Sequence, residues 1–340
     1  MLKRILFSFL PVLLLISLYQ FNSQPASTYR LGALSLPDFL GNTGLTRDTT
    51  HLPRVEIIQP DSSVSPEVRD YLVRGIGFMY KFYITKFDYA FPKDLTVKFR
   101  VYRDLDDYKA YTSQVASSPI ASHIGLYIHR LQEIVVWQGP DSARFTKTVF
   151  HETSHLLLRS QTHYCPRWLN EGLSEYFEEL DLTGAAPVVH SQPAKDKRMK
   201  KRLPEGHLPT LERYLTQTNR QWSREDNHSD APRTLAWSLV YYLMDSPKGQ
   251  LVIKDMLDYY RTQPVDPTQS LRVVNTFAEL DSFAFPRAET AVAFESNWRE
   301  WLAQERQQQP IAAEPLPKNH LASVRKWLAM KWEEKMVGKW

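Results

Sequence analysis

Residues 149–158, VFHETSHLLL, and residues 166–180, PRWLNEGLSEYFEEL, decide how the rest of the chain is interpreted. In a helix, residues four apart lie on one face, so His151 and His155 can offer two imidazole nitrogens to a single ion. Glu152 lies beside this pair, near enough to contact a metal-bound water without being a ligand. The apolar neighbours predict a buried helix over about 142–159, and a polar face inside such a helix needs partners.

A second helix, predicted over about 166–180, supplies those partners. Its apolar residues form one face, and Glu171, Glu175 and Glu178 lie at i, i+4 and i+7 on another. The 16 positions from His155 to Glu171 allow the first helix to end, turn and bring Glu171 alongside. Two histidines and one glutamate with an open fourth position form a catalytic zinc set.

Together the two stretches resemble the gluzincin metallopeptidases, the superfamily of thermolysin and aminopeptidase N. More narrowly, the chain from Gly125 to Leu243 is similar to bacterial gluzincin-like domains of unknown function. The resemblance implies a zincin-like fold, in which a small mixed sheet packs on the HExxH helix and a mainly helical part follows. It also implies one Zn²⁺ ion, with His151, His155 and Glu171 as ligands and Glu175 as the carboxylate that holds a zinc-binding histidine.

The same resemblance implies that the strand before the HExxH helix is the edge that pairs with an extended substrate. That strand is Glu133–Trp137 or its hairpin partner Ile124–Ile128. The Gly-x-Met-Glu-Asn signature that captures a substrate amino terminus in aminopeptidase N-like enzymes has no counterpart before His151, which favours an endopeptidase. No motif locates the group that steadies the tetrahedral oxyanion, and four candidates stay open: Tyr241, Tyr242, His228 and Arg233.

The sequence therefore predicts a zinc metallopeptidase in which Glu152 is the general base. Two alternatives remain. One is an envelope-tethered zinc-binding scaffold or pseudopeptidase without turnover, and the other is a coincidental, metal-free occurrence of the motif. Glu152 argues against the scaffold, because a purely structural zinc site is closed and has no use for a base.

Composition narrows the class of protein and its partners. The chain has 340 residues, 43% of them apolar and 24% charged, as in soluble globular proteins. The net charge of +4 includes Lys3 and Arg4 at the N-terminus, so the body is near neutral, and we expect a peptide or protein substrate rather than nucleic acid. The single cysteine, Cys165, excludes a disulfide framework, and we expect it to be a small buried hydrophobic residue.

The N-terminus has the features of an export signal. Lys3 and Arg4 precede the apolar run Ile5–Leu18, which at 14 residues is shorter than the roughly 20 that span a bilayer. We therefore expect residues 1–21 to be a signal peptide or an N-terminal anchor. The protein is then exported, either periplasmic or extracellular, or held at the inner membrane by an uncleaved segment.

Strands come before helices along the chain, which predicts an α+β fold. We expect an extended leader over 22–54, a catalytic domain over 55–306, and a linker with a basic amphipathic helix over 307–340. Residues 181–230 are predicted to be polar and irregular, with the basic run KDKRMKKR (195–202) in a solvated loop or at an anionic contact. The predicted elements are strands over 55–59, 95–102, 124–128 and 133–137, and helices over 66–87, 104–113 and 235–260, the last broken at Ser246-Pro247.

Overall fold

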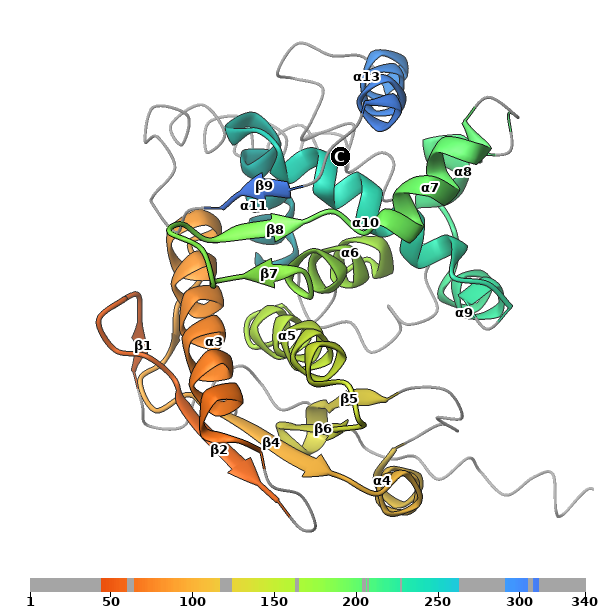
Figure 1. The fold of residues 1–340 in the computed structure, drawn as a ribbon. Helices are drawn as coiled ribbons and strands as arrows, with labels where there is room; N and C mark the ends of the chain where they lie inside the picture. Colours follow the sequence, from red (N-terminus) through yellow and green to blue (C-terminus); the bar gives the residue numbers. More distant parts are fainter. Residues whose placement is uncertain are drawn as a thin grey trace, which may run out of the picture. The chain divides into compact units, whose positions relative to one another are not determined.

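The computed structural model describes residues 44–59, 64–116, 124–162, 165–203, 206, 208–226, 228–262, 291–304 and 308–311 (Figure 1). The expected signal peptide or anchor lies outside these residues, as do most of the predicted leader and most of the predicted C-terminal segment. Across the described ranges, no helix combines the length and the apolar character that crossing a membrane requires.

A four-stranded mixed sheet in the order β2-β4-β6-β5 forms the first part of the fold. The parallel strands are β2 (Arg54–Ile58), β4 (Thr96–Tyr102) and β6 (Glu133–Trp137). At one edge, β5 (Gly125–Ile128) runs antiparallel to β6, to which a short 3₁₀ turn joins it. These bounds lie within one residue of the predicted strands, because each strand alternates apolar and polar residues or is continuously apolar.

Helices cover both faces of this sheet. The helix α3 (Pro66–Phe87) begins at Ser65, whose hydroxyl accepts the Val68 N–H, and it has the predicted bounds. It packs with α5 (Ser142–Arg159) and with one face of the sheet in the main hydrophobic core. On the opposite face, α4 (Leu105–Val115) contributes Tyr108 to a smaller cluster with Tyr102 and Val135.

The chain after α5 is mainly helical, and α6 (Arg167–Phe177) lies between α5 and α10 (Ala231–Met244) in Figure 1. The next helices are α11 (Pro247–Thr262), which follows the predicted break, and α13 (Ala291–Ala303). Cys165, which precedes α6, is half-buried against the main core. The described residues thus form an α+β fold.

The expectation of an irregular stretch over 181–230 is wrong. These residues contain the second residue of β7 (Leu180–Asp181) and all of β8 (Val188–His190), α7 (Pro193–Arg202), α8 (Leu211–Leu215) and α9 (Asn219–Asp226). The basic run therefore lies in a helix, α7. Three further short strands of the described residues fall outside the predicted elements. They are β1 (Leu45–Thr46) and β3 (Phe91–Pro92), which pair with each other, and β9 (Gln308–Pro310), which pairs with β8.

Candidate metal centre

Two packed helices bring together the three residues that the sequence predicts as ligands. The Nε2 atom of His151 lies 3.7 Å from Oε2 of Glu171, and the Nε2 atom of His155 lies 3.9 Å from the same oxygen. One ligand atom from each residue lies within 4.8 Å of the others. A tetrahedral zinc ion with bonds of about 2.0–2.1 Å separates its ligands by roughly 3.4 Å. Both nitrogen–oxygen distances lie within about 0.5 Å of that separation, so small side-chain shifts would bring Glu171 into ligand geometry with each histidine.

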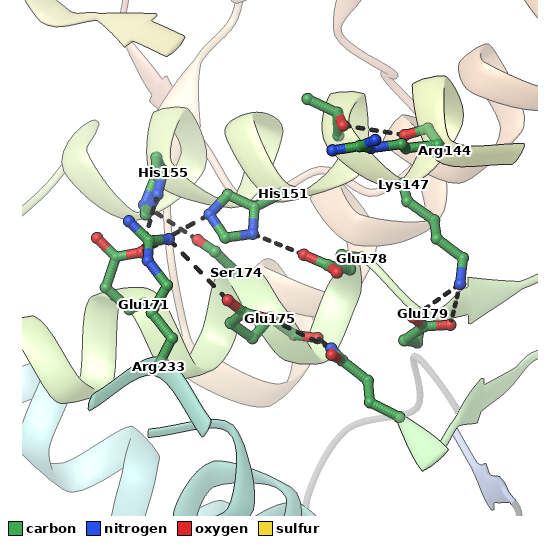
Figure 2. A network of polar contacts seen from close by, with 12 residues as sticks. Arg144, Lys147, His151, His155, Glu171, Ser174, Glu175, Glu178, Glu179 and Arg233 are labelled. Carbon is green, nitrogen blue, oxygen red and sulfur yellow. Dashed lines mark hydrogen bonds and ion pairs between the residues drawn. The ribbon is translucent and has the colours of Figure 1, made fainter. Parts of the chain in front are cut away.

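The other ring nitrogen of each histidine is held by residues of α6 or by its C-cap residue, Glu178. His151 donates from Nδ1 to Oε2 of Glu178 at 2.9 Å. The Nδ1 atom of His155 lies 3.0 Å from both Oδ1 of Asn170 and Oγ of Ser174. Figure 2 shows that these contacts leave both Nε2 atoms facing Glu171. Such hydrogen bonds fix the orientation and tautomer of histidines that bind metals.

Glu175, which the resemblance implies as the partner of a histidine, is held by other residues. Its Oε2 atom contacts the Nζ atom of Lys195 and accepts from Nε2 of Gln192 at 3.3 Å. The contact expected of Glu175 is made by Glu178, the C-cap residue of α6, which lies about one turn further along the chain. Both glutamates lie on the face of α6 that the helical spacing predicts, and the crossing of α5 over α6 selects the one that reaches His151.

Glu152 lies beside the imidazole pair, at the edge of the sheet. Its buried carboxylate accepts the backbone N–H of Tyr127, on β5, at 2.8 Å. Burial raises the pKa of Glu152 above its usual value of 4.5. A Cβ at Gly125 would lie 2.3 Å from Cγ2 of Thr148 and 3.2 Å from Cγ of Glu152, so glycine is needed for β5 to approach α5 this closely.

Of the four oxyanion candidates, the structure brings Arg233 to this centre. Its Nη1 atom donates to Oε2 of Glu171 at 2.6 Å, and its Nε atom donates to Asp226 at 3.0 Å. The other three lie in different surroundings. The buried Tyr241 donates to the carbonyl of Val189, Tyr242 packs against Phe294 and Trp301, and His228 is exposed between α9 and α10.

The two histidines have opposite protonation preferences. Burial by itself lowers the pKa of His151, but its contacts with Glu171 and Glu178 outweigh burial and raise the pKa to about 10. Burial lowers the pKa of His155 to about 3. For Glu171, burial acts to raise the pKa, and Arg233 with the two histidines holds it well below its usual value. Near pH 7 the centre therefore contains a protonated His151, a neutral His155 and an ionised Glu171.

Comparison with known proteins gives one family. A family model described as "Protein of unknown function (DUF1570)" matches residues 146–266. This span runs from α5 past the end of α11 and includes His151, Glu152, His155, Glu171 and Arg233. No curated protein matches the chain. The match covers the candidate centre and the helices around it.

Proposed function

We propose that this protein is a zinc-dependent metallopeptidase with a zincin-like fold that hydrolyses internal peptide bonds. The observation that carries the proposal is the convergence of His151, His155 and Glu171 on one point, with the buried Glu152 carboxylate beside them. When bound there, Zn²⁺ supplies a Lewis acid for the scissile carbonyl and lowers the pKa of a water molecule towards about 7. Three ligands from the protein leave the fourth position for that water or the substrate.

Glu152 is the general base of the proposed reaction. Its raised pKa favours transfer of a proton to it from the attacking water and then from it to the leaving amine. The Tyr127 N–H fixes one carboxylate oxygen, so the other is free to turn towards the water. A purely structural zinc site would have no use for this buried acid.

The edge strand β5 offers a backbone surface to an extended peptide. Trp137 donates to the carbonyl of Ile124, which makes Ile124 and Trp137 a hydrogen-bonded pair in the antiparallel ladder. Gly125 and Tyr127 then form the alternate pairs, so their backbone groups point away from β6. The Tyr127 N–H already binds Glu152 and Gly125 is buried, so the Tyr127 carbonyl, on the same edge, is the group proposed to pair with a substrate strand.

Arg233 is the proposed donor to the oxyanion. Its Nε and Nη1 atoms hold Asp226 and Glu171, and within the described residues no hydrogen bond uses its Nη2 atom. Two carboxylates already neutralise this guanidinium, so its remaining donors suit a carbonyl oxygen better than the free carboxylate at the end of a peptide. This balance of charge favours cleavage within a chain over removal of a C-terminal residue.

The proposal includes export. The segment over 1–21 would direct the protein out of the cytoplasm, to the periplasm or the medium, or hold it at the inner membrane. Fractionation of cells that express the full chain, together with N-terminal sequencing of the product, tests this part separately.

The decisive comparison is between the wild type and Glu152→Gln, with zinc content and cleavage of unfolded casein measured for both. We expect one zinc ion per chain in each protein and cleavage by the wild type alone. Glu179→Gln is a matched control, because Glu179 pairs with Lys147 rather than with the centre, and it should keep both properties. Zinc in both proteins with cleavage in neither would favour the envelope-tethered scaffold. Absence of zinc from the wild type would overturn the proposal.

A further inference from the structure

The basic helix α7 places one of its lysines inside the protein. Only 9% of the surface of Lys195 is exposed, whereas Lys197 and Lys201 on the same helix are exposed. The Nζ atom of Lys195 contacts Oε2 of Glu175. Lysine is rarely buried without a charged partner, because its ammonium group loses its hydration. The buried pair therefore joins α7 directly to α6.

A second contact strengthens this junction. Gln192, which precedes the first turn of α7, donates from Nε2 to the backbone carbonyl of Glu175 at 2.9 Å and to its Oε2 atom at 3.3 Å. The start of α7 thus holds both the main chain and the side chain of Glu175. Glu175 lies one helical turn after Glu171. These contacts therefore fix the part of α6 next to a proposed zinc ligand.

Glu175 also lies close to two groups of the candidate centre, Arg233 and His151. Its Oε1 atom is 4.0 Å from Nη1 of Arg233, the atom that donates to Glu171. One oxygen each from Glu175 and Glu178 and one ring nitrogen of His151 lie within 4.8 Å of one another (Figure 2). Without the ammonium of Lys195, the buried Glu175 carboxylate would compete with Glu171 for Arg233 and with Glu178 for His151.

We propose that Lys195 is a positioning residue for the zinc centre. By neutralising Glu175, it preserves the hydrogen bond from Arg233 to Glu171 and the one from His151 to Glu178. This inference rests on the proposed function, since it concerns residues that hold the proposed ligands. Among the described residues, Lys195 pairs with Glu175 and with none of the three proposed ligands, so its proposed effect passes through Glu175. The effect of losing its charge must therefore disappear when the charge of Glu175 is also removed.

The test is a double-mutant cycle on the full chain, with the dissociation constant of zinc measured by competition with a chromophoric chelator. Lys195→Met should weaken zinc binding by about 10–100-fold, the range seen when groups that orient metal ligands are lost. Glu175→Gln should bind zinc nearly as well as the wild type. The double variant should match Glu175→Gln within about twofold, as expected when the effect of Lys195 passes only through Glu175. Lys195→Arg keeps the charge and should keep most of the affinity.

Urea unfolding of the metal-free variants shows whether each one folds. If Lys195→Met does not fold, Lys195→Gln takes its place, since the amide keeps a polar contact with Glu175 but lacks the charge. If the wild type binds zinc, the inference would be overturned by a Lys195→Met variant that binds zinc with the same affinity. A double variant that binds zinc as weakly as Lys195→Met would also overturn it. A wild type that binds no zinc would instead overturn the proposed function.

Discussion

Replacing Gly172 with alanine tests whether the candidate centre depends on the close approach of α6 to α10. Gly172 follows Glu171 on α6, and Arg233 reaches Glu171 from α10. A Cβ at position 172 would lie 2.5 Å from Cγ2 of Val240 and 2.7 Å from the backbone oxygen of Ala236. The Val240 side chain can rotate, but the Ala236 carbonyl belongs to the backbone of α10, so the two helices must separate.

The expected cost follows from two opposing effects. Overpacking of a core contact costs about 1–3 kcal/mol, and the rigid carbonyl places this clash near 3 kcal/mol. Alanine is favoured over glycine inside a helix by about 1 kcal/mol. We therefore expect Gly172→Ala to lower the free energy of unfolding by about 2 kcal/mol and to weaken zinc binding, because the Arg233–Glu171 contact is strained.

Gly77→Ala is the matched control, since Gly77 also lies inside a helix, α3. Its nearest neighbour would be Cδ1 of Leu52 at 3.3 Å, the end of a half-exposed side chain that can move away. This variant should be more stable than the wild type by up to about 1 kcal/mol and should bind zinc normally. Urea unfolding of the metal-free proteins measures both changes. A Gly172→Ala protein as stable as Gly77→Ala would refute the argument from close packing.

Three further predictions concern the ligands and the helix that carries them. Glu178→Gln should weaken zinc binding by about tenfold or more, because His151 loses its charged acceptor, whereas Glu179→Gln should not, and chelator competition compares the two. Zinc binding near pH 7 should release about one proton from His151, whose pKa is about 10 in the metal-free protein, so the apparent affinity should rise with pH below that value. Calorimetry in buffers of different ionisation enthalpy counts the protons, and a count of zero would contradict the assigned charge state. Asp141→Ala removes the acceptor for two N–H groups at the start of α5 and should cost about 1 kcal/mol of stability, measured by urea unfolding, with unchanged zinc stoichiometry.

The parts of the fold that the sequence predicts well have a strong local pattern. The helix α3 has its N-cap at Ser65, a proline in its first turn and apolar residues at helical spacing, and its bounds are as predicted. The helix α7 lacks such a pattern, because six of its ten residues are Lys or Arg and only Lys195 and Met199 are buried. Contacts with α6 and other distant elements stabilise it, and those contacts cannot be derived from local spacing. The strand β9 depends in the same way on pairing with β8.

In the candidate centre, the sequence indicates which residues share a helical face but not which of them touch. The spacing of His151 and His155 and the carboxylates of α6 are sufficient to predict the cluster with Glu171. The hydrogen-bond partners depend on how two helices cross. Glu178 therefore binds His151 where Glu175 was expected, and Glu175 binds a lysine from a segment that was predicted to be a solvated loop.

The most direct test of the zinc centre is a crystal structure of zinc-loaded protein with diffraction data collected at the zinc absorption edge. We expect one anomalous peak at about 2.0–2.2 Å from Nε2 of His151, Nε2 of His155 and a carboxylate oxygen of Glu171. A zinc-loaded crystal with no peak between these three side chains, or with the Glu171 carboxylate turned away from the peak, would contradict the account.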